Sequence, residues 1–417
     1  MVKQRQNVLG RAREGLPRHP AGSAGRLLGV AGAVSIVAAV SLGSTALASA
    51  SGAAVGGAVS LASPTPFLAG LKTVTTVAPS APTGGDVNPY GVAVVPASRD
   101  KLVAGDVLVS NFNNSANQQG TGTTIFEIAP NGDRHLFAEI TPQSAAGKAC
   151  GGVGLTTALA VFRRGWVVVG SLPTSDGTSA TASGGCLFVI DSQGRVVRTI
   201  TSPLINGPWD LAAADEGAQG VLFVANVLNG TLAADPPGSV VNDGTVVRIR
   251  LDLPTTGVPS VANQAVIASG FSERTDPNAL VIGPTGAALG PNGTLYVADT
   301  LNNRISAVPD AMSRQTTAFT GQDLTSNGFL QGPLGLAIAP NGDILTVNSQ
   351  DGNIVETSPS GAQVAHVTLD NNGGAGDLFG LAVAPNGRSL YFVDDFGGPN
   401  TPASNPLANS LALAQSA

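Results

Sequence analysis

Apolar and polar residues alternate with a period of two along most of the chain, which favours strands over amphipathic helices. The clearest unit, TGAALGPNGTLYVADTLNNRISAV at 285–308, has a small-residue strand, a Pro-Asn-Gly turn, an apolar strand ending in Asp, a polar turn and a third strand. Other copies lie at 332–361 and 378–395 and, more weakly, at 89–114, 152–173 and 208–229. Repeats of this length and alternation are typical of β-propeller blades.

Each copy predicts a blade of four strands. The Gly- and Ala-rich inner strands, which would crowd around a central channel, are predicted at 91–95, 154–161, 210–214, 286–289, 335–339 and 380–384. Second strands are predicted at 106–111, 166–171, 221–226, 294–299, 343–348 and 389–394. Third strands are predicted at 123–129, 186–191, 245–251, 304–308, 353–358 and 410–415. Outer strands are predicted at 135–140, 196–201, 265–269, 316–320 and 364–369.

This register leaves the sixth blade one outer strand short. The segment KTVTTVA at 72–78 has the length and alternation to supply that strand. Joining the two ends of the chain in one blade leaves no unpaired sheet edge at the seam. The sequence therefore predicts an all-β, six-bladed β-propeller over 72–417, closed by an N-terminal strand.

Residues 1–50 have the composition of a secretory signal peptide. Basic residues precede an apolar run at 27–47, and Ala46, Ala48 and Ala50 offer cleavage sites. An uncleaved membrane anchor is the alternative, because the run is just long enough to cross a hydrocarbon core of about 30 Å. Residues 51–71 are predicted to be a flexible tether. We therefore expect a secreted or extracytoplasmic protein that contacts a membrane only if the N-terminal segment is retained.

The charge argues against nucleic acid as a partner. The net charge is −6, and cleavage after Ala50 would remove six basic residues and one acidic residue, which shifts it to −11. An acidic surface repels phosphate backbones. An aromatic content of 4% also leaves few rings for base stacking.

The two cysteines, Cys150 and Cys186, are predicted to form a disulfide. An even pair in an exported protein is more often bridged than free, and two cysteines without nearby His make a poor zinc site. A bridge would pin the loop at 171–185 and stabilise the fold by roughly 3–4 kcal/mol in the chain-entropy model.

The segment TLYVADTLNNRISAV at 294–308 resembles an NHL repeat, in which an apolar strand is followed by Asp and then by Asn-Arg-Ile at the next strand. PNGDILTVNSQDGNIV at 340–355 and PNGRSLYFVDD at 385–395 resemble it less completely. The resemblance covers roughly 72–415 and implies a propeller. It implies no single activity, because NHL-type propellers include binding modules, lactonases and lyases.

Polar residues end all six predicted second strands on one face of the channel: Asn111, Ser171, Asn226, Asp299, Asn348 and Asp394. Oxygen ligands around a channel mouth would suit Ca²⁺. The alternative is that they form Asx-type turns with their own backbone. The long connections 111–122, 171–185, 226–244 and 395–409 emerge on the same face, where recognition loops usually lie.

Trp209 and Asp210 begin the third inner strand near the channel mouth. A Trp beside a carboxylate can stack on a sugar or hold a cation, although packing beneath a loop is commoner for Trp. Gluconolactonase-type propellers, which this chain resembles in blade number, hold a divalent cation with a Glu, an Asn and an Asp at such positions. Here NPYG at 88–91 lacks the Glu, Trp209 replaces the Asn, and only Asp210 matches.

Three hypotheses remain open, and whether the protein is an enzyme is left undecided. Histidine chemistry is not expected, since His135 and His366 fall on predicted outer strands. The favoured hypothesis is an exported, non-catalytic binding propeller that holds a glycan, a peptide or a cell-envelope component on its long-loop face. The alternatives are a purely structural surface protein and a Ca²⁺-dependent lactonase or hydrolase. The metal ligands of that hydrolase would be Asp210, Asn226, Asp299, Asn348 and Asp394.

Overall fold

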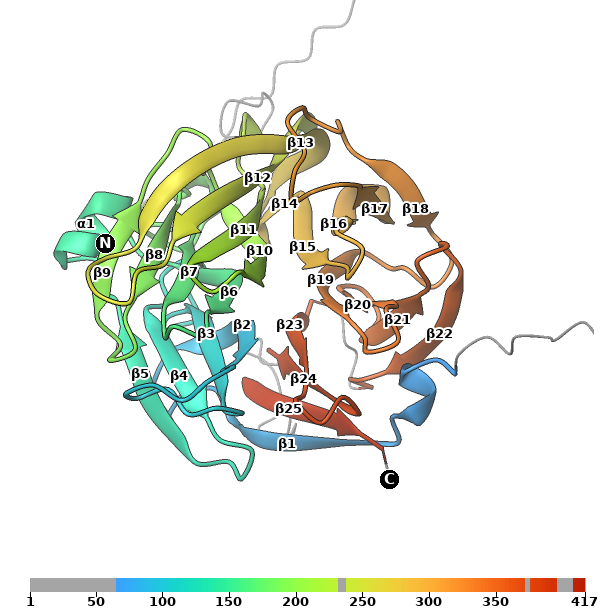
Figure 1. Cartoon of the computed structure of the whole chain (residues 1–417), viewed down its shortest axis with the longest axis horizontal. Helices are drawn as coiled ribbons and strands as arrows, with labels where there is room; N and C mark the ends of the chain where they lie inside the picture. Colours follow the sequence, from blue (N-terminus) through green and yellow to red (C-terminus); the bar gives the residue numbers. More distant parts are fainter. Residues whose placement is uncertain (1–64, 232–237, 372–375, 396–407, 417) are drawn as a thin grey trace, which may run out of the picture. The chain divides into compact units, whose positions relative to one another are not determined.

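Six antiparallel sheets follow one another around a ring, which confirms the predicted six-bladed propeller (Figure 1). The computed structural model describes residues 65–231, 238–371, 376–395 and 408–416. The predicted signal peptide and the first part of the predicted tether, up to residue 64, lie outside these ranges. No helix among the described residues is long and apolar enough to cross a membrane.

In each of the first three blades, the strands follow one another along the chain from the inner strand outward. Blade 1 contains β2 (Val87–Val94), β3 (Val107–Asn113), β4 (Thr124–Ile128) and β5 (Arg134–Glu139). Blade 2 contains β6 (Leu155–Val161), β7 (Val167–Ser171), β8 (Cys186–Ile190) and β9 (Val196–Ile200), with the 3-10 turn η2 (Ser179–Thr181). Blade 3 contains β10 (Pro208–Asp215), β11 (Gln219–Asn226), β12 (Val241–Asp252), β13 (Ser260–Asp276) and β14 (Leu280–Ile282).

The last three blades follow the same order, and β1 supplies the outer strand of blade 6. Blade 4 contains β15 (Pro284–Leu289), β16 (Leu295–Asp299), the 3-10 turn η4 (Thr300–Asn302), β17 (Arg304–Val308) and β18 (Gln322–Ser326). Blade 5 contains β19 (Pro333–Ile338), β20 (Ile344–Asn348), β21 (Asn353–Thr357) and β22 (Gln363–Thr368). Blade 6 contains β23 (Leu378–Val383), β24 (Ser389–Asp394), β25 (Ser410–Gln415) and β1 (Thr73–Pro79).

The N-terminal strand closes the ring as predicted, because β1 pairs antiparallel with β25 from Thr73↔Gln415 to Pro79↔Ser410. A 3-10 turn, η1 (Leu68–Gly70), precedes β1. The buried carboxylate of Glu356 on β21 accepts the backbone N–H groups of Phe67 (2.7 Å) and Leu68 (2.8 Å). The last residues of the predicted tether are therefore held against blade 5, next to the blade that β1 completes.

Two outer regions differ from the prediction. The outer strand of blade 4 is β18 at 322–326, not 316–320, because Phe319 and Gly321 adopt positive φ and form a turn. The strand QDLTS is largely exposed, so it carries no apolar alternation that the sequence could reveal. In blade 3, β13 runs on beyond the predicted 265–269 and folds back on β14, so this sheet has five strands.

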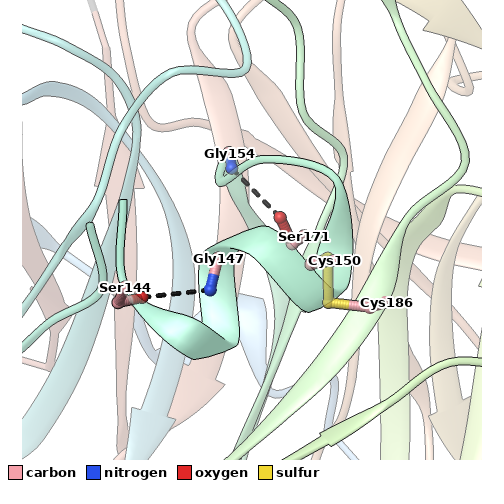
Figure 2. The surroundings of a disulfide bond; sticks show 6 residues. All are labelled: Ser144, Gly147, Cys150, Gly154, Ser171 and Cys186. Carbon is pink, nitrogen blue, oxygen red and sulfur yellow. Dashed lines mark hydrogen bonds between the residues drawn. A yellow bond between two sulfur atoms is a disulfide. The ribbon is translucent and has the colours of Figure 1, made fainter. Parts of the chain in front are cut away.

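Cys150 and Cys186 form the predicted disulfide, with their Cα atoms 5.5 Å apart (Figure 2). Cys150 ends a short helix, α1 (Ala145–Cys150), whose N-cap Ser144 accepts the N–H of Gly147. Cys186 begins β8. The bridge ties the connection between blades 1 and 2 to the sheet of blade 2. Such a disulfide is typical of proteins in oxidising compartments.

Candidate functional site

A bulge near the start of each inner strand builds the mouth of the central channel. In blades 1, 3, 4, 5 and 6 the inner strand has one residue more than its partner at this point. A bulge bends the strand and re-aims a side chain. One residue from each of these bulges lines a common pocket: Tyr90, Trp209, Thr285, Leu334 and Phe379.

Glycines just after three of these positions allow the blades to meet. A β-carbon on Gly286 would overlap the carbonyl oxygen of Leu334, and one on Gly335 would overlap that of Phe379. A β-carbon on Gly380 would overlap the carbonyl oxygen of Tyr90. In blades 4, 5 and 6 the inner strand therefore packs its glycine against the bulge of the next blade. This explains the Gly bias of the inner strands and sets the positions of the pocket side chains.

The pocket has a volume of about 490 Å³ and a floor of stacked aromatic rings. The Tyr90 ring lies between Phe112 (centroids 4.4 Å apart) and Phe379 (4.0 Å). Trp209 lies 6.0 Å from Tyr90 at a tilt of 38°. Offset and tilted ring pairs at these distances are favourable beyond their buried area. The floor is therefore an apolar, well-packed surface.

Polar side chains form the rim of the pocket. The loop after β3 supplies Asn113, Asn117 and Gln119, and the turn between β13 and β14 supplies Asn278. Gln119 Nε2 donates to the carbonyl oxygen of Asn278 at 2.6 Å, which links the rims of blades 1 and 3. Asn88 completes this side and is buried, with a left-handed φ of 58° that Asn tolerates.

Two carboxyl groups from blade 6 also line the pocket. The backbone N–H of Asp395 donates to the carbonyl oxygen of Asp377 at 2.8 Å, so the two residues are neighbours. Burial, with a contribution from Asp370, raises the pKa of Asp377 to about 6. Burial, followed by the charges of Asp377 and Asp394, raises the pKa of Asp395 well above its usual range. Asp395 therefore favours the protonated carboxyl more strongly than an ordinary Asp does.

Asp210 occupies a second, smaller space between the inner strands. This cavity has a volume of about 50 Å³ and a mainly aliphatic lining that includes Leu211 and Leu381. The Asp210 carboxyl accepts the N–H groups of Leu211 (2.8 Å) and Ala287 (3.1 Å), which joins blades 3 and 4. Burial raises its pKa to about 8. Adjacent residues on β10 thus face different spaces, Trp209 the pocket and Asp210 the inner cavity.

The polar residues that end the second strands are buried and do not line the pocket. Asn111 donates to Thr124, and Ser171 accepts the N–H of Gly154. Asp394 ends β24. The assignment of these three residues to a ligand-binding face stays a prediction.

The other three strand ends make similar local bonds. Asn226 accepts the N–H of Asn206, and Asn348 accepts the N–H of Gln331. Asp299 pairs with Arg304 at 2.7 Å. A calcium ion shared by the five predicted ligands stays a prediction. Among the described residues no group of three or more His, Cys, Asp or Glu side chains is placed to hold a metal ion.

Sequence reasoning placed Trp209 near the channel mouth and missed the other bulge residues. The sequence did contain a signal for them: a large apolar or aromatic residue directly before an inner-strand glycine. This signal occurs at Tyr90, Leu334 and Phe379. The β13–β14 turn was missed because β14 has only three residues. His135 and His366 lie on the outer strands β5 and β22, as predicted.

Comparison with known proteins supports the fold. No protein-family model matches the chain, and no curated protein matches its sequence. A gluconolactonase from Xanthomonas campestris is 14% identical with a TM-score of 0.51, covering 84% of this chain and 92% of that one. The calcium-binding protein regucalcin from Agrobacterium tumefaciens is 13% identical with a TM-score of 0.53, covering 83% and 94%. At these identities the likeness shows a shared six-bladed propeller fold and no activity.

Proposed function

We propose that the pocket at the channel mouth binds a compact small molecule, and that this is the protein's function. The observation that carries the proposal is the composition of the pocket. It has room for a molecule of ordinary metabolite size, stacked aromatic rings on its floor and amide groups on its rim. Concave, partly apolar pockets with a few placed polar groups are the usual form of ligand sites.

The lining indicates the kind of molecule. Trp209 and Phe379 offer apolar contact to the flat face of a ring, as aromatic side chains do for sugars. Asn113 and Gln119 offer hydrogen bonds to polar substituents. A compact molecule fits this description better than an extended peptide, because the loop after β3 and the β13–β14 turn both border the pocket. The disulfide suits binding outside the cytoplasm.

Hydrolysis of a lactone or another ester is the second candidate, and the carboxyl pair favours it. The Asp377 carboxylate can take a proton from a water that attacks the ester carbonyl carbon, and the Asp395 carboxylic acid can give its proton to the departing alkoxide oxygen. The carbonyl–oxygen bond breaks and a hydroxy acid results. A gluconolactonase is among the proteins of similar fold.

The two tryptophans of the chain allow a direct test of binding. Trp209 lines the pocket, whereas Trp166 donates to the carbonyl oxygen of Pro254 on another part of the propeller. In the full chain carrying Trp166→Phe, the fluorescence of Trp209 should change as sugars, lactones and other small molecules are added. The matched variant Trp209→Phe should lose this signal and bind the same molecule about tenfold more weakly.

The result also separates the two candidates. Turnover of a bound lactone that is lost in Asp377→Asn and Asp395→Asn supports hydrolysis, whether calcium or EDTA is present. Binding without turnover supports the binding function. If no molecule in a broad screen changes the fluorescence of Trp209 or the thermal midpoint of the wild-type chain, the proposal is wrong.

A further inference from the structure

Several buried hydrogen-bond acceptors among the pocket residues lack partners. Buried oxygen atoms of four lining residues have no hydrogen-bond partner among the described residues: Asn88 Oδ1, Asn113 Oδ1, Gln119 Oε1 and Asp395 Oδ1. A buried acceptor left without a partner costs about 1–3 kcal/mol. Four in one pocket indicate that a ligand supplies the missing donors.

The orientation of the Gln119 amide follows from its other bond. Gln119 Nε2 donates to a backbone carbonyl oxygen, which can only accept, so Gln119 Oε1 is the free end of the amide. Asn113 Nδ2 donates to Asn117 Oδ1 at 2.6 Å, which leaves Asn113 Oδ1 without a partner. The hydroxyl groups of Thr285 and Thr300 already bond each other and the Pro333 carbonyl oxygen.

All the charged side chains that line the pocket are acidic. Its lining contains Asp276, Asp377 and Asp395, and no Lys, Arg or His in the described part of the chain. Asp276 is neutralised by Arg274 at 2.6 Å, which leaves the two carboxyl groups of blade 6. Aromatic rings beside carboxyl groups attract organic cations. The volume of about 490 Å³ is far larger than a metal ion with oxygen ligands at about 2.3–2.6 Å requires.

We infer that the ligand of this pocket is an organic amine, with its protonated ammonium group among the unpartnered oxygens and Asp377 and Asp395, and its carbon frame on the aromatic floor. The inference rests on the proposed function and names its ligand class. An ammonium group provides three N–H donors for the unpartnered oxygens and a positive charge for the carboxyl groups. A quaternary ammonium meets only the charge, and a neutral alcohol meets only part of the hydrogen bonding.

Three probes of one shape separate these contributions. The full chain is titrated in a calorimeter with 2-phenylethylamine, with its trimethylammonium derivative and with 2-phenylethanol. The amine should bind at least about tenfold more tightly than either of the others, since charge-assisted hydrogen bonds are roughly twice as strong as neutral ones. Equal binding of the alcohol would overturn the inference and leave the proposed pocket function intact. Failure of the amine to bind overturns it as well.

Isosteric variants test the two carboxyl groups. Asp377→Asn and Asp395→Asn should each weaken amine binding about tenfold or more and leave alcohol binding unchanged. Asp323→Asn makes the same change on the exposed strand β18 and should alter neither. An effect on both probes alike, or on neither, contradicts the inference.

A measurement on the wild-type chain removes the dependence on the folding of variants. The pKa of Asp395 is raised by burial and by its acidic neighbours, which favours the protonated carboxyl in the free protein. An ammonium group at this position favours the carboxylate, so binding should release a proton to the buffer. The calorimetric enthalpy should then differ between phosphate and Tris at the same pH. Identical enthalpies in the two buffers would contradict the placement of the ammonium group beside Asp395.

If none of the three probes binds, the screen with Trp209 fluorescence decides what remains. A neutral molecule that binds there leaves the pocket function standing without the amine. If that screen also finds no molecule that binds, the proposed function is overturned together with the inference.

Discussion

The channel-mouth pocket and the inner cavity are built by the same inner strands, yet they are chemically opposite. The pocket is wide, about 490 Å³, and four of its acceptor atoms lack protein partners. The cavity is narrow, about 50 Å³, and both oxygens of its one carboxyl, Asp210, accept backbone N–H groups. The bulges cause the difference, because they turn large side chains outward and leave glycine and aliphatic residues below. A polar group satisfied by the protein is structural, whereas unsatisfied groups beside open space are available to a ligand.

The largest expected effect comes from crowding the close contact between Gly380 of blade 6 and the bulge of blade 1. In Gly380→Ala the new methyl group overlaps the carbonyl oxygen of Tyr90, so blades 6 and 1 must move apart. We expect a loss of about 3 kcal/mol in the free energy of unfolding, at the upper end for overpacking. Gly70→Ala is the matched control, since a methyl group there meets no atom within 4 Å. Urea unfolding of both variants measures the difference, and equal midpoints would show that the contact is not tight.

The second effect is the pH dependence of stability, to which the Asp210 carboxyl of the inner cavity should contribute. The pKa of Asp210 is about 8 in the folded protein, against 3.8 for an ordinary Asp, so between these values the folded state keeps a proton that the unfolded chain has lost. Stability should be full below about pH 4 and fall as the pH rises to about 8, by up to about 1.4 kcal/mol per pH unit for this group.

Asp210→Asn removes the titrating group, so the slope of unfolding free energy against pH should become shallower. The slope should not vanish, because burial also raises the pKa of Glu273 to about 9. Asp323→Asn on β18 should leave the slope as in the wild type. An unchanged slope in Asp210→Asn would mean that Asp210 ionises normally despite its burial.

A third, smaller effect should come from the aromatic floor of the pocket. Phe379→Leu keeps an apolar side chain and removes the ring that stacks on Tyr90 at 4.0 Å. We expect a loss of about 1 kcal/mol in stability, together with weaker binding of ring-bearing ligands. Thermal unfolding and the fluorescence titration of Trp209 report the two effects separately. A loss of stability without any change in binding would place Phe379 in the scaffold alone.

The smallest effect should be that of Tyr90→Phe. The ring remains between Phe112 and Phe379, and only the hydroxyl group beside Asn88 is lost. One hydrogen bond contributes about 1 kcal/mol or less to stability. Denaturant midpoints should therefore shift less than for Phe379→Leu. A larger shift would show that the hydroxyl group, not the stacking, holds the floor in place.

The architecture could be predicted from the sequence because the patterns that define its strands are local. Alternation within each blade and the recurring Pro-Asn-Gly turns located the strands, and the spare segment at 72–78 predicted the closure by β1. The outer strand of blade 4 was misplaced because its exposed, polar residues leave no hydrophobic pattern. The pairing of Cys150 with Cys186 needed only an even count and an exported context.

Only part of the candidate site could be predicted from the sequence. Trp209 was placed near the channel mouth, but its neighbours in the pocket come from segments distant in sequence, such as Tyr90 and Phe379. Strand-end residues such as Asn226 and Asn348 looked like candidate ligands, yet they bond the backbone of nearby loops. Composition alone cannot distinguish a polar side chain that caps its own turn from one that faces a cavity.

The sequence by itself determined the number of blades, the closure of the ring and the disulfide, because each follows from periodicity or from a count within the chain. Only the tertiary structure decided that Trp209 faces the wide pocket while the adjacent Asp210 faces the narrow cavity. The physical reason is that neighbouring residues of a strand point in opposite directions, and the packing of the blades decides which space lies on each side. The ring then brings together bulges that lie far apart along the chain, and their side chains acquire a common surface only when the propeller closes.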